Sequence, residues 1–318
     1  MTDVAMIAVS DGSIRQGKNS VQYNDMRAIQ QELVAAGYSA EILFRNEIGK
    51  AVKAKKALFA HIGTIVNFGG IQQDALKNSL NAINQFDGPV ITFTNDVIDG
   101  IKNNDRSGFV TIDRPVYYSD PGGINNAEKL TKNLDIISGI TLNQSWVIGK
   151  KLSERPLLKK EPIYDYIYGG RNRPKIVRYL KKVVKQNSNG LVYGKICQDV
   201  SAKYNFSQKF CFTNDDVTTI DSLGKYSFMF YEKNKNYFTS RVFEQLFSNS
   251  IVLFDTEFKE LKDFWRDDNT FSTPEELQQR ISEPWSWERV KKQHEMAKAF
   301  DFDSHIQEEA RALKKIIN

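Results

Sequence analysis

Short apolar runs alternate along this chain with segments whose apolar residues recur at helical spacing, and this alternation constrains the fold most. Residues 4–9 form an apolar run that ends in a Ser-Asp-Gly loop. Three residues on one helical face follow, Met26, Ile29 and Leu33, and residues 40–44 form the next apolar run. A strand, a helix and a second strand in this order predict a parallel α/β sheet.

The alternation continues through the first half of the chain and restarts in the second half. Further strands are predicted at residues 57–62, 89–93, 163–168, 190–196, 226–231 and 251–254. Helices are predicted to begin at Thr239, at Pro174 and, after a Thr-Pro-Glu-Glu capping box, at Pro274. In a sheet of this kind, functional groups lie on the loops that follow the carboxyl ends of the strands.

The length of 318 residues fits two domains of about 150 residues each. Residues 149–162 are basic and contain two prolines, which is typical of a linker. We therefore predict two Rossmann-like, doubly wound lobes, at residues 1–150 and 163–290, that face a central cleft.

The composition is that of a globular protein, with 41% hydrophobic and 26% charged residues. The chain contains no run of about 18 apolar residues and no signal peptide after Met1, so we expect a cytoplasmic protein without a membrane segment. The two cysteines, Cys197 and Cys211, lack the spacing of a zinc site, and no metal site is predicted.

The net charge of +5 is unevenly distributed along the chain. Lysines cluster at Lys50, Lys53, Lys55 and Lys56, and basic residues cluster again at residues 150–160. Clusters of this kind usually form solvated surface, but they also suit a polyanion, because binding to phosphates releases counterions. Charge alone leaves both interpretations open.

Gly169, Gly170, Arg171 and Arg173 occupy the turn between a predicted strand and the helix that begins at Pro174. Glycines allow a ligand to approach the backbone closely, and a helix N-terminus provides unpaired N–H groups with partial positive charge. The arginines add planar donors that suit diphosphate oxygens. An ordinary strand-to-helix turn with exposed arginines explains the same pattern, so both interpretations stay open at this point.

Arg241 and Glu244 lie three residues apart at the start of a predicted helix, so their side chains share a face. Arg241 is a candidate cation for the diphosphate of a nucleotide, and Glu244 is a candidate acceptor for both ribose hydroxyls. A surface salt bridge within the helix is the simpler interpretation of the pair in isolation.

These residues, in this order, resemble the DNA β-glucosyltransferase family of T-even phages. Members of this family have the GT-B fold and transfer glucose from UDP-glucose to 5-hydroxymethylcytosine in duplex DNA. The resemblance is best in the second lobe and extends more weakly over nearly the whole chain. The segments that carry it are residues 165–170, 236–244, 251–258 and, in the first lobe, residues 66–70 with Phe93 and Thr94.

The resemblance implies an inverting, UDP-sugar-dependent glycosyltransferase whose second lobe binds the donor. Gly170, Arg171 and Arg173 would hold the diphosphate of the UDP-sugar. Arg241 and Glu244 would hold the uridine diphosphate end of the same donor. The turn in this chain is shorter than the corresponding turn in the family. Arg173 therefore aligns with the family's segment better than Arg171 does. A Mg²⁺ ion on the diphosphate is compatible with this arrangement.

The predicted catalytic base is Asp96. The family has an aspartate directly after the Phe-Thr pair, whereas this chain reads Phe93-Thr94-Asn95-Asp96. Asparagine is not a useful base at neutral pH, so Asp96 must take this role with a shift of one residue. The alternative is a loop aspartate that caps a turn. Asp25 stands where the family has an acidic sugar contact one methylene longer, so glucose and a pentose such as arabinose both stay open.

The implied acceptor is duplex DNA with a hydroxymethylated pyrimidine, either cytosine or uracil, and this base must leave the stack to reach the catalytic base. The predicted DNA contacts are Lys53, Lys55, Lys56, Arg106 and Arg114. The family also implies a C-terminal helix, residues 291–318, that packs toward the first lobe. No obligate protein partner is inferred.

Other functions stay open on the sequence. One keeps the GT-B fold with a non-DNA acceptor or with sugar-nucleotide epimerisation. Another is a DNA-binding protein on an inactive transferase scaffold, and the retention of both Arg241 and Glu244 argues against it. A NAD-dependent enzyme is disfavoured, because residues 10–13 lack the dinucleotide-binding glycine pattern.

Overall fold

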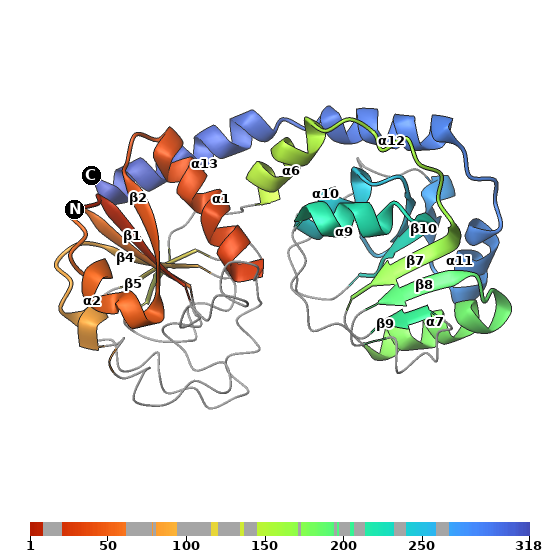
Figure 1. Cartoon of the computed structure of the whole chain (residues 1–318), viewed down its shortest axis with the longest axis horizontal. Helices are drawn as coiled ribbons and strands as arrows, with labels where there is room; N and C mark the ends of the chain where they lie inside the picture. The colour runs from red at the N-terminus through yellow and green to blue at the C-terminus, as the bar shows by residue number, and fades with distance from the viewer. Residues whose placement is uncertain are drawn as a thin grey trace. The chain divides into compact units, whose positions relative to one another are not determined.

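The computed structural model divides into two compact units, called here the first and the second lobe. The first lobe consists mainly of Met1–Val147 and Phe302–Asn318, and the second of Ile148–Lys233 and Tyr237–Asp301 (Figure 1). The structure describes residues 1–8, 21–61, 78, 81–93, 116–119, 134–136, 145–170, 173–193, 196, 204–206, 214–231, 240–258 and 267–318.

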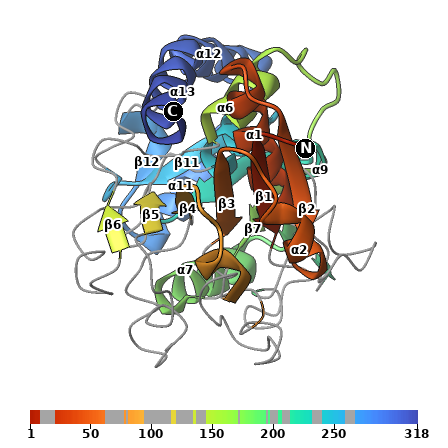
Figure 2. The same cartoon turned by 90° about the vertical axis from the view of Figure 1, so that its left-hand side faces the viewer.

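The first lobe is built on a six-stranded parallel sheet with the order β2-β1-β3-β4-β5-β6 (Figure 2). Its strands are β1 (Val4–Ala8), β2 (Ala40–Phe44), β3 (Ala57–His61), β4 (Val90–Phe93), β5 (Val116–Ser119) and β6 (Leu134–Ile136). All five side chains of β1 are buried, which is expected for a central parallel strand covered on both faces. The predicted parallel α/β sheet is therefore confirmed for this lobe.

Helices α1 (Val21–Ala35) and α13 (Phe302–Ile317) pack against each other in the first lobe. The predicted helical face of α1 is buried in the core with β1 and β3, where it meets the two apolar residues Leu313 and Ile317 of α13. A short helix, α2 (Ile48–Ala51), follows the 3-10 turn η1 (Arg45–Glu47). The C-terminal helix thus completes the core of the lobe that contains the N-terminus.

The second lobe contains another six-stranded parallel sheet, with the order β12-β11-β10-β7-β8-β9. Its strands are β7 (Tyr164–Gly169), β8 (Gly190–Tyr193), β9 (Tyr204–Phe206), β10 (Gly224–Met229), β11 (Ile251–Asp255) and β12 (Thr270–Phe271). Counted within this lobe, the order is 6-5-4-1-2-3, which is the order of a Rossmann sheet. The sequence-based prediction of a second Rossmann-like lobe is confirmed.

Helices of the second lobe lie between these strands along the chain or follow the last strand, β12. They are α7 (Pro174–Gln186), α9 (Asn214–Asp221), α10 (Ser240–Leu246), α11 (Pro274–Ile281) and α12 (Trp287–Lys298), with the 3-10 turn η5 (Asp267–Asn269). Proline occupies the first turn of α7 and of α11, as predicted. The side chain of Thr273 accepts a hydrogen bond from the backbone N–H of Glu276 at 3.1 Å, which confirms the predicted cap of α11.

Two segments differ from the sequence-based prediction. The predicted linker at residues 149–162 begins inside a helix, because α6 spans Ser145–Ser153 and buries Ile148 and Leu152. The C-terminal region is not one helix: α12 ends at Lys298 in the second lobe, and α13 begins at Phe302 in the first. Among the described helices, none is long and apolar enough to cross a membrane.

Candidate donor site in the second lobe

The strand order of the second lobe predicts where a ligand binds. In an open α/β sheet, ligands bind beyond the carboxyl ends of the strands at the point where the strand order reverses. Here that point lies between the neighbouring parallel strands β7 and β10. Gly169 ends β7 and Gly170 follows it, and α10 is the first helix described after β10. The two segments selected from the sequence are therefore attached to the two strands at this point.

Gly169 ends β7, and the ring of Tyr193 occupies the place of its missing side chain. A Cβ atom at Gly169 would lie 1.8 Å from the ring carbon Cζ of Tyr193, which ends the neighbouring strand β8. The glycine is therefore required for packing between β7 and β8, whatever ligand binds nearby. At the exposed Gly170, an added Cβ would lie 2.5 Å from the hydroxyl oxygen of Tyr168.

Arg173 occupies the N-cap position of α7, in extended backbone conformation, and Pro174 follows it. The Arg173 side chain is exposed and makes no capping hydrogen bond to the first turn of the helix. The first turn of α7 contains no acidic residue, so no carboxylate within it competes for an anion at this helix N-terminus. The role of Arg173 as a contact of a diphosphate stays a prediction.

Lys175, in the first turn of α7, forms an ion pair that sequence analysis did not find. Its Nζ lies 2.6 Å from the carboxylate of the buried Asp255 and 2.8 Å from that of Glu257. Burial lowers the pKa of Lys175, but its two carboxylate partners outweigh this effect and raise the pKa above its usual value. The pair joins the start of α7 to the end of β11 and so fixes the helix N-terminus.

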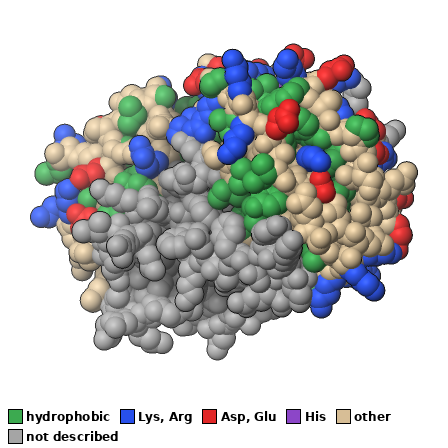
Figure 3. Space-filling view, turned by 45° about the vertical axis from the view of Figure 1, so that its right-hand side comes forward, with side chains coloured by type: hydrophobic (Ala, Val, Ile, Leu, Met, Phe, Trp, Pro, Cys, Tyr) green, Lys and Arg blue, Asp and Glu red, His purple; other side chains and the backbone are tan. Residues whose placement is uncertain are grey.

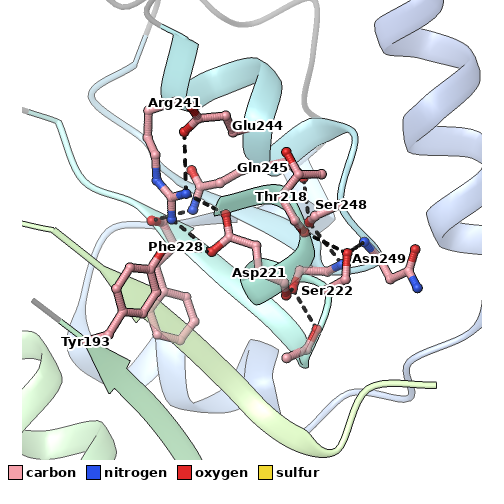
Figure 4. A network of polar contacts seen from close by, with 12 residues as sticks. Tyr193, Thr218, Asp221, Ser222, Phe228, Arg241, Glu244, Gln245, Ser248 and Asn249 are labelled. Atoms are coloured by element: carbon pink, nitrogen blue, oxygen red, sulfur yellow. Dashed lines mark hydrogen bonds and ion pairs between the residues drawn. The ribbon is translucent and has the colours of Figure 1, made fainter. Parts of the chain in front are cut away.

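Arg241 and Glu244 lie on the first turns of α10, where they form a cluster with Asp221 of α9 (Figure 4). Arg241 donates two hydrogen bonds to the Asp221 carboxylate, from Nη1 at 2.5 Å and from Nη2 at 3.0 Å. Nη1 of Arg241 also lies 3.7 Å from Oε2 of Glu244. The side chains of Asp221 and Glu244 are 0% and 8% exposed, so the pair is not the simple surface salt bridge that the sequence also allowed.

Tyr193 completes this cluster by donating a hydrogen bond from its hydroxyl to Oδ1 of Asp221 at 3.2 Å. Burial raises the pKa of Asp221, and the positive charge of Arg241 opposes this shift. Burial also raises the pKa of Tyr193, which therefore keeps its proton. Sequence analysis missed both residues, because Asp221 precedes Arg241 by twenty positions and no spacing rule relates them.

The buried segment Ser248-Asn249-Ser250 holds α9 and α10 in place. Ser250 donates to the backbone oxygens of Asp221 and Gly224, the latter at 2.6 Å. The backbone N–H of Asn249 donates to Ser222 at 3.0 Å, and its carbonyl accepts from the indole of Trp285 at 3.1 Å. These hydrogen bonds fix the backbone that carries Asp221.

The structure describes only some of the site residues that the sequence predicts in the first lobe. Asp25 lies in α1, but its side chain is outside the described part of the structure. Asp96, Arg106 and Arg114 also lie outside the described residues, as does Arg171 of the second lobe. The strand that leads to Asp96 is β4, which ends at Phe93.

Lys53, Lys55 and Lys56 precede β3, at the amino end of the first sheet. The Nζ of Lys56 lies 3.3 Å from Oδ1 of Asn318 and 5.3 Å from the ring centre of Tyr38. The parallel strand β4 ends at the carboxyl end of the same sheet. The lysines therefore lie about 16 Å from that end, which is the length of a five-residue strand.

No family model matches the sequence, and the curated proteins contain no significant match. Solved structures do match over the whole chain. A mutant of T4 phage β-glucosyltransferase in complex with UDP-glucose aligns with a TM-score of 0.69 and 17% identity, covering 99% of both chains. A structure of the DNA-modifying enzyme β-glucosyltransferase aligns with a TM-score of 0.68, 16% identity and the same coverage.

A third solved structure is an α-glucosyltransferase in complex with UDP and a 13-mer DNA that contains a hydroxymethyluracil base. It aligns with a TM-score of 0.58 and 11% identity, and the match covers 99% of this chain and 95% of the other. At these identities the likeness establishes the fold. The chain has the two-lobed GT-B fold that the sequence predicted.

Proposed function

We propose that this protein is a glycosyltransferase that transfers a sugar from a UDP-sugar to a hydroxymethylated pyrimidine in duplex DNA. The observation that carries the proposal is the fold likeness over 99% of the chain to solved DNA-modifying glucosyltransferases. Two of these matching structures contain UDP-glucose, and another contains UDP with hydroxymethyluracil DNA. The cluster at the strand-order reversal of the second lobe supports a nucleotide site in this chain.

The donor would bind at the second lobe. Gly170, Arg173 and the N-terminus of α7 provide backbone N–H groups and positive charge for the diphosphate. Arg171 belongs to the same proposed turn. Arg241 and Glu244 would hold the uridine diphosphate end, with Glu244 as the acceptor for the ribose hydroxyls.

The proposed reaction is a direct displacement at the anomeric carbon, with inversion. Asp96 would remove the proton from the acceptor hydroxyl as its oxygen attacks the sugar. Asp25 would contact the sugar, and its short side chain leaves glucose and a pentose such as arabinose as candidates. The negative charge that develops on UDP would be stabilised by the cations and the helix N-terminus of the second lobe.

A metal ion is not required by this mechanism. No group of three His, Cys, Asp or Glu side chains gathers into a metal site in the part of the chain that the structure describes. A Mg²⁺ ion on the diphosphate of the donor is compatible with the mechanism.

Duplex DNA is the proposed acceptor, and positive charge on both lobes suits it. In the first lobe the proposed contacts are Lys53, Lys55, Lys56, Arg106 and Arg114. In the second lobe α7 contains basic residues and no acidic one, and Figure 3 shows Lys and Arg side chains gathered at the lower right of the viewed face. A base in the duplex must leave the stack to enter an active site, at a cost of a few kcal/mol.

Release of UDP from a UDP-sugar tests the proposed acceptor. The protein is incubated with UDP-glucose and with duplexes that differ only in one hydroxymethylated pyrimidine. We expect UDP release that depends on the hydroxymethyl group. Equal release with unmodified DNA, or release only with a glycan or small-molecule acceptor, would reject DNA as the acceptor. Conversion of the UDP-sugar without transfer would indicate an epimerase.

A further inference from the structure

Helix α7, at the lower edge of the second lobe in Figure 1, presents a row of positive charges to the solvent. The residues that α7 buries in the core of the lobe are Ile176, Tyr179, Leu180 and Val183. Arg178, Lys181 and Lys185 are three and four positions apart, so they share the face of the helix opposite these residues. All three residues are exposed, and we call this row the α7 stripe.

Two other lysines of α7 lie on its flank, and carboxylates of neighbouring elements neutralise them. Nζ of Lys175 lies 2.6 Å from the carboxylate of Asp255, which ends β11. Lys182 forms an ion pair with Glu275 of α11. The flank of α7 is therefore occupied by interactions within the lobe.

The α7 stripe has no such ion pairs. α7 contains no acidic residue, and among the described residues no carboxylate forms an ion pair with Arg178, Lys181 or Lys185. The guanidinium carbon of Arg178 lies 5.6 Å from the ring centre of Tyr179, a contact that leaves its charge in place. Like charges three and four positions apart on a helix repel one another. An anion with several charges would relieve this repulsion.

The length of the stripe matches the charge spacing of a nucleic-acid strand. Arg178 and Lys185 are seven positions apart, which corresponds to a rise of about 10 Å along the helix. One strand of duplex DNA carries a phosphate every ~3.4 Å along the duplex axis, so about three phosphates fit along this length. The three cations of the stripe therefore suit a polymer with regularly spaced negative charges.

We propose that the α7 stripe binds the phosphate backbone of duplex DNA as a sequence-independent contact of the second lobe. The inference rests on the proposed function, because that function makes duplex DNA the acceptor. Phosphate contacts fix the position of a protein on the duplex and carry no sequence information. The stripe would therefore determine how tightly DNA is held, and not which base is modified.

The experiment measures the Kd of the full chain for two duplexes of the same sequence, with and without one hydroxymethylated pyrimidine, across a salt series. The test variant combines Arg178→Gln, Lys181→Gln and Lys185→Gln, which remove the charges and keep good helix formers. The slope of log Kd against log salt should fall by roughly 0.9 for each lost phosphate contact, so by about two to three in all. Affinity at low salt should fall about 10- to 100-fold for both duplexes, and the ratio of the two Kd values should not change.

The matched control combines Lys291→Gln, Lys292→Gln and Lys298→Gln, which change three exposed lysines of α12. It removes the same net charge from the same lobe, but α12 also carries the exposed Glu288 and Glu295. We expect the control to lower the slope by less than about one. Thermal melts verify that both variants are folded. Equal slopes in the test variant and the control would overturn the proposal, because net charge rather than the stripe would then explain DNA binding.

The remaining outcomes separate the stripe from the proposed function. Weaker binding of the test variant to phosphatidylglycerol vesicles, with unchanged DNA binding, would overturn the proposal and assign the stripe to a membrane surface. If the wild-type protein transfers sugar to DNA but the test variant binds DNA like the control, the stripe is rejected and the proposed function stands. If the stripe sets the salt dependence but no DNA receives a sugar, the proposed function fails and the DNA surface stands. A wild-type protein that binds neither duplex would reject both.

Discussion

At the scale of single residues, Gly169 and Tyr193 connect the packing of the second sheet to the proposed donor site. The ring of Tyr193 fills the space where a Gly169 side chain would lie, and its hydroxyl reaches Asp221. Any side chain at position 169 must therefore displace the ring that supports the Asp221–Arg241 pair. A substitution at position 169 is therefore expected to change both the packing and the proposed donor site.

Gly169→Ala is expected to destabilise the protein by about 1–3 kcal/mol, because the new methyl group overlaps the Tyr193 ring. Urea denaturation measures this change. Gly49→Ala is the control, since nothing lies within 4 Å of an added Cβ there and alanine favours the helix. Equal stability of Gly169→Ala and the wild type would show that the ring does not hold this position.

Asp96→Asn tests the proposed base. The variant should lower sugar transfer by about 10²- to 10⁴-fold, because asparagine cannot accept the proton of the acceptor hydroxyl. UDP affinity should stay unchanged, because the proposed nucleotide contacts lie in the other lobe. Transfer kinetics and calorimetry on the same preparation measure the two quantities. Full activity of the variant would exclude Asp96 as the base.

The sequence identified site residues that lie next to a recognisable local pattern. Gly169, Gly170 and Arg173 flank a strand-to-helix turn, and Arg241 and Glu244 share a helical face, so local rules made them candidates and the family resemblance selected them. Asp221 and Tyr193 could not be selected in this way. They reach Arg241 only through the packing of α9 and β8 around it, and no rule of sequence spacing encodes such a contact.

At the scale of elements, α1 and α13 are joined by a buried pair of carboxyl groups. Glu32 of α1 and Glu309 of α13 are 1% and 5% exposed. Among the described residues, no N–H group donates to either oxygen of Glu32. Burial raises the pKa of Glu32 well above its usual value, and the negative charge of Glu309 raises the pKa further. The interior of the lobe therefore favours the protonated form of Glu32.

This pair makes stability depend on pH. A carboxyl group whose pKa is higher in the folded than in the unfolded state contributes stability below the unfolded pKa, and this contribution is lost as pH rises through the folded pKa. The first lobe should therefore melt at lower temperature as pH rises. Glu32→Gln should flatten this dependence, because an amide can donate to Glu309 without titrating. Thermal melts between about pH 5 and pH 9 measure the effect.

The control for this experiment is Glu308→Gln, which changes an exposed residue of the same helix α13. It should shift stability by no more than about 0.5 kcal/mol and leave the slope with pH unchanged. If Glu32→Gln and Glu308→Gln show the same pH dependence as the wild type, the raised pKa of Glu32 does not contribute to stability.

The lysines that precede β3 provide a test of DNA binding by the first lobe. Substitution of Lys53, Lys55 and Lys56 by glutamate should weaken DNA binding and lower the slope of log Kd against log salt by roughly one for each phosphate that the variant no longer binds. Binding across a salt series measures both quantities. Unchanged affinity would remove this face from the proposed DNA surface and leave Arg106 and Arg114 as its candidates in the first lobe.

Elements with a strong local signal were predicted well. The proline at the start of α7 and the Thr273 cap of α11 mark helix ends through local hydrogen bonding and backbone geometry. The start of the predicted linker was wrong, because the basic residues of α6 lie on a helix that buries Trp146, Ile148 and Leu152. Charge and proline content do not reveal that burial. The break between α12 and α13 was missed for a similar reason, since both segments are charged and helical in sequence.

At the scale of the whole molecule, the fold is retained although few residues are identical. A TM-score of 0.69 accompanies only 17% identity over 99% of the chain. Many combinations of apolar residues can fill the core of a parallel sheet, so the core tolerates substitution more readily than a site that must bind a particular ligand. This explains why the pattern of strands and helices predicted both lobes, whereas the sugar and the base need an experiment on the site itself.

The central claim is that the protein attaches a sugar from a UDP-sugar to a hydroxymethylated base in DNA. The most direct measurement is the mass of the nucleosides recovered from hydroxymethylated duplex DNA after incubation with the protein and, separately, UDP-glucose or a UDP-pentose. We predict that one donor adds the mass of its sugar to the hydroxymethylated nucleoside, and that nothing is added without a donor or without the hydroxymethyl group. DNA that gains no mass with any UDP-sugar, from a protein that binds UDP, would contradict the account.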